Sequence, residues 1–137
     1  MKINAYINFN GRCDEALEFY KGALNARVDT VMRYKDAPEM PPPGMVAPGS
    51  ENKVMHSSFR VGETDVMATD GYCGGQPEIK GISLTLTADD EAGARRAFDA
   101  LAAGGQVQMP LGKTFFSPCF GMLADRFGVQ WMIIVLG

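Results

Sequence analysis

The most constraining feature of this 137-residue sequence is an order of elements that occurs twice. Each half begins with a short alternating strand, continues into an amphipathic helix and ends in several further strands. The first strands are INAYINF, residues 3–9, and ISLTLT, residues 82–87. A spacing of about 75 residues is too long for a solenoid repeat. The pattern predicts an α+β fold of two βαβββ modules, residues 1–72 and 80–137, in a single domain of residues 1–137.

The two helices are predicted from apolar residues spaced three and four apart. The apolar stripe of the first helix, within residues 11–26, is Ala16, Phe19, Tyr20, Ala23 and Leu24. Asn25 is expected to end this helix in the left-handed conformation. The stripe of the second helix, residues 90–103, is Ala94, Phe98 and Leu101. Asp89 is the expected N-cap of the second helix.

Two irregular stretches separate the strands. Residues 37–52, APEMPPPGMVAPGSEN, hold five prolines and two glycines and so form a long loop. This loop is either a lid, in which Glu39, Met40 and Met45 cover a ligand, or a mobile connector. Residues 71–81, GYCGGQPEIKG, are expected to link the modules.

Composition and motifs exclude several classes of protein. The net charge of −3 and the pI near 5.1 provide no basic surface for nucleic acid or for an anionic membrane. The longest apolar run, Trp131 to Leu136, is too short to span a bilayer, and the N-terminus does not resemble a signal peptide, so a cytoplasmic location is expected. The three cysteines lack a CxxC spacing and are expected to be free thiols. No stretch resembles a G-x-G-x-x-G turn or a P-loop, so nucleotide binding and methyl transfer lack support.

Four stretches that cover nearly the whole chain have the pattern of one protein family: YINFNGRCDEALEFYKGAL, VMHSSFRVGETDVMATD, ISLTLTADDEAGARRAFDALAAGG and MPLGKTFFSPCFGMLADRFGVQWMI. In these the chain resembles the PhnB-like proteins of the vicinal oxygen chelate superfamily, which includes glyoxalase I, extradiol dioxygenases and bleomycin- and fosfomycin-resistance proteins. It departs at Leu24-Asn25, where Phe-Gly is usual, and at Arg126, where Pro is usual. The resemblance implies a cupped mixed β-sheet with helices packed outside and a ligand cavity inside.

In the enzymes of this superfamily, histidine and glutamate side chains hold a divalent metal in that cavity. The corresponding positions here are Asn4 or Ala5, Met67 or Ala68, Gly81 or Ile82, and Met132. None of these is a usual ligand for a divalent transition metal, because such ions take His, Cys or carboxylate donors. We therefore expect no metal and no cofactor.

Strand alternation also predicts which side chains face the cavity. The candidate ligand-binding residues are Asn4, Tyr6, Asn8, Ser58, Arg60, Ser83, Thr85, Gln130 and Met132. His56, the only histidine, is the candidate catalytic residue, either as a general base or as a hydrogen-bonded structural residue. Arg60 either binds a carboxylate or phosphate or is solvated, and Asn8 either orients a ligand or shapes the following turn.

Two functions from different classes fit these features. The first is a small-molecule-binding protein of the glyoxalase/bleomycin-resistance superfamily, without a bound metal and of unassigned activity. The second is a metal-dependent lyase or dioxygenase of glyoxalase type that acts on a small oxygenated substrate. Modules of this superfamily pair within a chain or across a dimer, so the resemblance also implies a homodimer. The small-molecule partner is not identified by the sequence.

Overall fold

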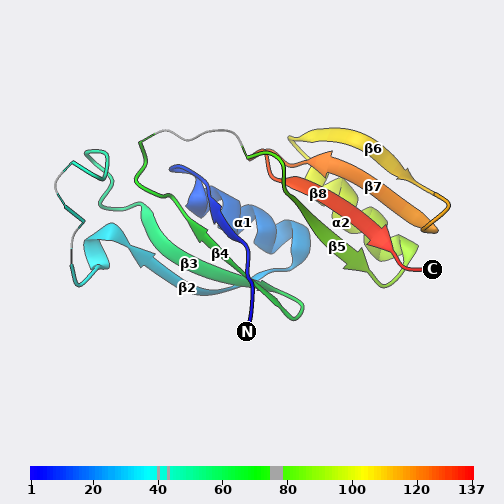
Figure 1. Ribbon diagram of the computed structural model, residues 1–137, viewed down its shortest axis with the longest axis horizontal. Helices are drawn as coiled ribbons and strands as arrows, with labels where there is room; N and C mark the ends of the chain where they lie inside the picture. Colours follow the sequence, from blue (N-terminus) through cyan, green and yellow to red (C-terminus); the bar gives the residue numbers. More distant parts are fainter. Residues whose placement is uncertain (40, 43, 75–78) are drawn as a thin grey trace. The chain divides into compact units, whose positions relative to one another are not determined.

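A computed structural model describes residues 1–39, 41–42, 44–74 and 79–137 of the chain (Figure 1). The chain divides into two compact units, Met1–Gln76 and Pro77–Gly137, which we call module 1 and module 2 from here on. The division falls inside the stretch that was expected to link the modules. That the two modules form a single domain stays a prediction.

Module 1 contains one helix and four strands. Its elements are β1 (Tyr6–Asn8), α1 (Cys13–Leu24), β2 (Arg27–Arg33), the short 3-10 helix η1 (Tyr34–Asp36), β3 (Val54–Val61) and β4 (Thr64–Thr69). The strands form one sheet in the order β1-β4-β3-β2. The first strand is parallel to β4, and the other pairs are antiparallel.

Module 2 repeats this arrangement. Its elements are β5 (Ser83–Ala88), α2 (Glu91–Ala102), β6 (Gln106–Gly112), β7 (Cys119–Ala124) and β8 (Gln130–Val135). The strand order is β5-β8-β7-β6, again with the first strand parallel to the last. The predicted α+β fold of two βαβββ modules is therefore confirmed, with a four-stranded mixed sheet in each module.

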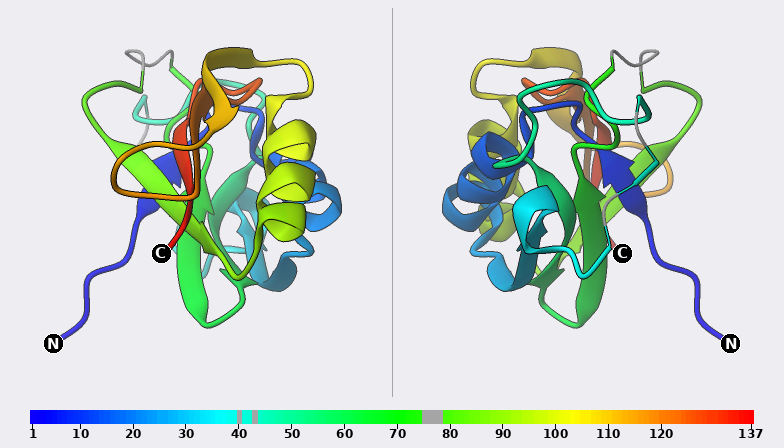
Figure 2. Two further views of the ribbon diagram at one scale, coloured as in Figure 1. Left: turned by 90° about the vertical axis from the view of Figure 1, so that its right-hand side faces the viewer. Right: turned by 90° about the vertical axis from the view of Figure 1, so that its left-hand side faces the viewer.

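Each helix lies along one side of the strands of its own module (Figure 2). In module 1 the helix buries Cys13, Ala16, Leu17 and Tyr20. The ring of Tyr20 stacks on that of Phe59 from β3, with centroids 5.4 Å apart. Leu17 therefore belongs to the buried face, whereas Phe19, Ala23 and Leu24 of the predicted stripe are only half-buried. Asn25 ends the helix in the left-handed conformation, as predicted, with φ of 54°.

The second helix confirms the predicted stripe of Ala94, Phe98 and Leu101, all of which are buried. Phe98 packs against β7 at Gly121, where a Cβ atom would lie only 2.8 Å from the phenylalanine ring. The predicted N-cap was wrong by one residue. Asp90, not Asp89, is the N-cap, and its carboxylate accepts a hydrogen bond from the Gly93 N–H at 2.7 Å. This side chain satisfies one of the N–H groups that a helix leaves unpaired at its N-terminus.

The loop at residues 37–52 is tied to the module at several points. The Ala47 N–H donates to the Tyr72 carbonyl oxygen at 2.9 Å, and Ser50 near the end of the loop is buried. Met45 is exposed, whereas Met40 and Pro43 lie outside the described residues. Whether the loop acts as a lid or as a connector stays open. Among the described residues, no helix is long and apolar enough to cross a membrane.

Two buried aspartates, one in each module, accept hydrogen bonds from N–H groups close to the ends of strands and of a helix. Asp70, directly after β4, accepts hydrogen bonds of 2.8 Å from the backbone N–H groups of Gly11, Cys13 and Val54. Asp125, directly after β7, accepts from the backbone N–H groups of Phe127 and Val129 and from the Trp131 indole N–H. Each carboxylate therefore replaces water for three donors, two of them in buried hydrogen bonds, which would otherwise be costly to bury.

The first prediction concerns Asp70. In Asp70→Asn the amide can keep one acceptor oxygen toward Gly11 and Cys13, but its NH2 group then faces the Val54 N–H. Because this leaves a buried donor without an acceptor, we expect the free energy of unfolding to fall by about 2–3 kcal/mol. Urea unfolding followed by circular dichroism measures the change. Asp99→Asn, at an exposed position of α2, is the matched control and should change the free energy by less than about 0.5 kcal/mol. Equal effects of the two substitutions would contradict the role of Asp70.

Candidate functional site

The face of the module 1 sheet opposite α1 carries the candidate site, and we call it the helix-free face. Cross-strand partners lie on the same face of a sheet. The register places Tyr6 beside Met67, Met67 beside Ser58, and Ser58 beside Thr30. By the same registers the face consists of Tyr6, Asn8, Arg27, Thr30, Met32, His56, Ser58, Arg60, Asp65, Met67 and Thr69. The predicted residues Tyr6, His56, Ser58 and Arg60 thus do share one face.

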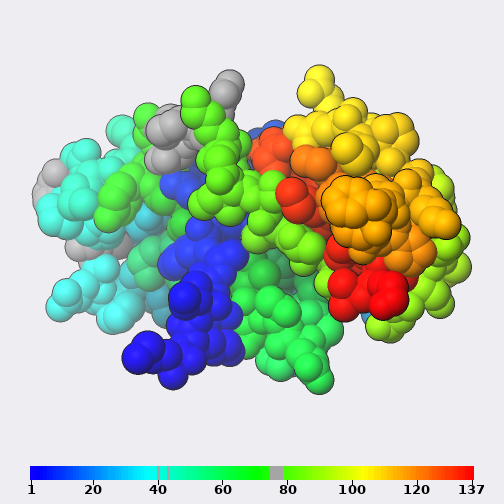
Figure 3. Space-filling view, turned by 45° about the vertical axis from the view of Figure 1, so that its right-hand side comes forward, coloured from blue at the N-terminus to red at the C-terminus, as the bar shows by residue number. Residues whose placement is uncertain are grey.

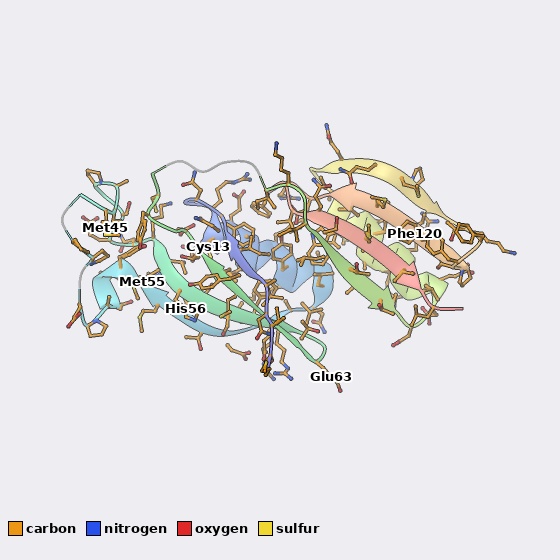
Figure 4. All side chains as sticks on the ribbon, in the orientation of Figure 1. Cys13, Met45, Met55, His56, Glu63 and Phe120 are labelled. Atoms are coloured by element: carbon orange, nitrogen blue, oxygen red, sulfur yellow. The ribbon has the colours of Figure 1, made fainter. Side chains whose placement is uncertain are left out.

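Tyr6 and His56 form the most specific polar contact on this face. The Tyr6 hydroxyl oxygen and His56 Nδ1 are joined by a hydrogen bond of 2.9 Å, in which the histidine tautomer decides the donor. The two rings meet edge to face, with centroids 5.6 Å apart. Figure 4 labels His56 on β3. Because β1 and β3 are separated by β4, the tyrosine side chain crosses the intervening strand to reach the histidine.

The surroundings keep the Tyr6 phenol protonated. Partial burial raises the pKa of Tyr6 above its usual value, and a hydrogen bond with Thr69 opposes this increase. The Thr69 hydroxyl itself donates to the Met55 carbonyl oxygen at 2.7 Å and accepts from the Gly71 N–H at 2.9 Å. Tyr6 is nevertheless 51% exposed, so its hydroxyl lies at the surface of the face. The pair combines a neutral phenol with an imidazole at a position that a ligand can contact.

Arg60 lies on the helix-free face but is already engaged. Its guanidinium donates to the Asp65 carboxylate at 3.0 Å and to the backbone carbonyls of Gly62 and Glu63. Lys2 binds the other oxygen of Asp65 at 3.2 Å. The arginine therefore serves first to join β3 to β4, and a ligand carboxylate would have to compete with Asp65.

The two asparagines also have structural partners. Asn4 donates to the Asp65 carbonyl oxygen at 2.9 Å and so fastens the segment before β1 to β4. Asn8 accepts from the Asn10 N–H at 2.9 Å, which favours its predicted role in the turn. Its amide also lies against Gly71, where a Cβ atom would be 2.3 Å from the Asn8 nitrogen. Their roles as ligand contacts stay predictions.

The module 2 residues of the predicted site lie on the face of their own sheet opposite α2. Ser83 pairs with Gln130, and Thr85 pairs with Met132, with 3.9 Å between the Thr85 hydroxyl and the Met132 sulfur. Gln130 accepts a hydrogen bond of 2.7 Å from Gln108 of β6. Beside them Phe120, labelled in Figure 4, contacts the ring of Phe116 at 4.9 Å. The loop that holds Phe116 stands out at the surface in orange in Figure 3.

The positions that correspond to metal ligands in this superfamily do not fit a divalent metal. Met67 lies on the helix-free face, whereas Ala68 is fully buried on the side of α1. Each of the methionines Met67 and Met132 pairs with a residue of the first strand of its module, Tyr6 and Thr85 respectively. Thioether and amide groups are poor donors for such ions. The described residues also contain no group of three or more His, Cys, Asp and Glu side chains able to hold a metal ion.

Sequence reasoning missed the contacts that join different strands. Alternation assigns Tyr6 and His56 to one face, but only the strand order β1-β4-β3 brings them within hydrogen-bond distance. Thr69 was missed for the same reason, whereas the ring contact between Phe116 and Phe120 is local and was missed because no pattern predicts how the loop before β7 turns. The signal that would have found Tyr6 and His56 is the parallel pairing of the first and last strands of a βαβββ module.

Comparison with known proteins identifies the family. The model of the 3-demethylubiquinone-9 3-methyltransferase family matches residues 1–134. The chain belongs to this family. Protein PA1353 of Pseudomonas aeruginosa is 39% identical, with a TM-score of 0.87 over 99% of this chain and 98% of that one. The PhnB protein of Bacillus cereus is 29% identical, with a TM-score of 0.81 over 98% of this chain and 99% of that one.

The fold that the resemblance implied is also confirmed. A glyoxylase/bleomycin resistance protein/dioxygenase domain from Frankia sp. EAN1pec has a TM-score of 0.71 over 100% of this chain and 98% of that one. At 12% identity this likeness shows the fold alone. The chain therefore has the fold that its resemblance to the vicinal oxygen chelate superfamily implied.

The second prediction concerns the cysteines. Burial raises the pKa of the Cys13 thiol to about 12, and a hydrogen bond with Ser57 opposes this only in part. Ser57 donates its own proton to the Ala68 carbonyl oxygen, so the thiol is the donor across the 3.6 Å to Ser57. Cys119 is also buried, whereas Cys73 is half-buried. A thiol reagent at pH 8 should therefore label Cys73 in the native protein and the other two cysteines only in urea. Native labelling of Cys13 at the rate of Cys73 would contradict this assignment.

Proposed function

We propose that this chain is a small-molecule-binding protein whose ligand contacts the helix-free face of module 1. The observation that carries the proposal is the hydrogen-bonded pair of Tyr6 and His56 on that face. A ligand site in a protein combines a few oriented polar groups with apolar walls. Here the walls are the thioethers of Met32, the cross-strand partner of His56, and Met67, the partner of Tyr6.

Other residues predicted from the sequence are proposed as further ligand contacts. Ser58 lies beside Met67 in the middle of the face. Ser83, Thr85, Gln130 and Met132 occupy the face of the module 2 sheet that α2 does not cover, and their roles as ligand contacts stay predictions of their own module. A homodimer and a cytoplasmic location are retained as proposals on the strength of the sequence alone.

We also propose that binding needs no divalent metal. The support is the chemistry of Asn4, Met67 and Met132 at the positions where the metal-dependent enzymes of this superfamily have ligands. The alternative is a metal-dependent lyase or dioxygenase of glyoxalase type. Its metal would have to be held without the usual set of histidine and carboxylate donors.

The third prediction separates these two functions. In protein purified without chelators, elemental analysis should find nickel, zinc, iron and manganese each well below one equivalent per chain. His56→Gln should leave the metal content unchanged. One tightly held equivalent that is lost in His56→Gln would favour the metal-dependent enzyme and refute the proposal.

The fourth prediction tests the site. A ligand is first found by thermal-shift screening of the wild-type protein with a library of small oxygenated compounds. Tyr6→Phe removes only the hydroxyl, and His56→Gln removes the ionisable ring, so each should weaken binding of that ligand about tenfold, or roughly 1.4 kcal/mol. Asp99→Asn on the exposed side of α2 serves as the control and should bind as the wild type does. Wild-type affinity in both site variants would place the ligand elsewhere.

A further inference from the structure

We propose that the Tyr6–His56 pair binds an anionic oxygen group of the ligand, of the carboxylate class, and that this binding is coupled to protonation of His56. This inference rests on the proposed function, because it names the chemical class of ligand for the same site. It follows from a count of the protons that the two side chains can share across their hydrogen bond.

In the neutral state the pair has one proton between the two facing atoms. Two arrangements are possible, since histidine carries its proton on either ring nitrogen. Either the Tyr6 hydroxyl donates to Nδ1 and Nε2–H is free to donate to a ligand, or Nδ1–H donates to the Tyr6 oxygen and Nε2 is a free acceptor. In the first arrangement the only free donor is Nε2–H. In the second the only free donor is the Tyr6 O–H, and Nε2 can only accept. The neutral pair therefore offers a ligand one donor at most.

Protonation of His56 removes this choice. The imidazolium has N–H groups on both nitrogens, so Nδ1–H must donate to the Tyr6 oxygen across the 2.9 Å contact. The Tyr6 hydroxyl proton is then directed away from the histidine, where a ligand oxygen competes for it with the Thr69 hydroxyl oxygen, and Nε2–H is the second donor. Two donors and one positive charge match the two oxygens and the negative charge of a carboxylate. A neutral amide of the same shape gains much less from the change.

The neighbouring groups leave the charge of the imidazolium available to a ligand. Tyr34 of η1 remains a neutral phenol, because burial raises its pKa and its hydroxyl donates to the Gly71 carbonyl oxygen. Asp70, after β4, is occupied by three backbone N–H groups. The pairs of opposite charge on the strands themselves are formed by Arg27 with Asp29 on β2 and by Arg60 of β3 with Asp65 of β4.

The charges at the far end of the face also favour an anion. Asp65 is shared by Arg60 and Lys2, so this cluster of two cations and one carboxylate has a net charge of +1. The cluster lies about 13 Å from His56, four residues along β3 at roughly 3.3 Å per residue. At that distance its attraction for an anion is largely screened at physiological ionic strength and becomes appreciable only in dilute salt. The local charge thus differs in sign from the net charge of −3 of the whole chain.

The coupling has a defined direction with pH. An anion that prefers the imidazolium raises the titration midpoint of His56. Its affinity is therefore greatest below the midpoint of the free protein and is lost as the pH rises through the higher midpoint of the complex. Because carboxylic acids titrate near pH 4, the anion persists throughout this window.

The test uses the fact that the chain has one histidine, whose ring signals in a nuclear magnetic resonance spectrum need no assignment. The His56 midpoint is measured alone, with benzoate and with benzamide, each at about 10 mM, enough to occupy a millimolar site. We expect benzoate to raise the midpoint by about one pH unit, which corresponds to about tenfold tighter binding to the protonated form. Benzamide should leave it unchanged. In Tyr6→Phe the shift caused by benzoate should fall to less than half.

Each contrary result has a separate meaning. An unchanged midpoint with benzoate, or an equal shift with benzamide, would overturn the anion inference. A full benzoate shift in Tyr6→Phe, with a circular dichroism spectrum like that of the wild type, would overturn the role of the pair. The proposed function survives these outcomes if a screened ligand still loses affinity in Tyr6→Phe and His56→Gln, and it fails by itself if no ligand depends on either residue.

Discussion

One buried carboxylate holds together the parts of module 1 on which the candidate site depends. Asp70 accepts backbone N–H groups from the turn after β1, from the first residue of α1 and from the first residue of β3. The helix has no side-chain cap of its own at Arg12, so this carboxylate supplies the acceptor and the negative charge that favour a helix N-terminus. Tyr6 lies just before that turn and His56 just after the start of β3. The same carboxylate therefore fixes the strands that carry both members of the pair.

The two modules share one strand order but carry different side chains on the face that their helix leaves uncovered. In module 1, Tyr6, Met67 and Ser58 lie side by side across three strands. In module 2, Thr85, Met132 and Met122 also lie side by side across three strands. The methionine on the last strand is the shared element, while its neighbours are polar in module 1 and partly thioether in module 2. In a sheet of fixed register, one residue of a face can be substituted without moving its neighbours. The ionisable pair of Tyr6 and His56 can therefore be present in module 1 without a counterpart in module 2.

Local patterns in the sequence were enough to predict the elements but not the contacts between them. Apolar spacing identified both helices, and the identity of Asn25 identified a helix end, because each signal depends on residues close in the chain. The N-cap was misplaced because Asp89 and Asp90 are equally suitable by type, and only the direction of the chain at the helix start selects Asp90. Alternation placed Arg60 on the correct face but could not reveal that Asp65 on the adjacent strand engages it. Such pairings depend on strand order, which no local pattern encodes.

The side chains of the helix-free face limit how strongly it can stabilise charge on a ligand. A divalent ion can polarise two oxygens of a substrate at once, whereas a phenol and an imidazole supply charge-assisted hydrogen bonds of about 1.5–3 kcal/mol each. Part of that energy is offset by removing the ligand anion from water. Most of the affinity must then come from apolar contact with Met32 and Met67, whose unbranched side chains adapt to ligands of different shape. In the proposed site, the polar pair therefore selects the charge and the orientation of the ligand, and the methionines supply most of the affinity.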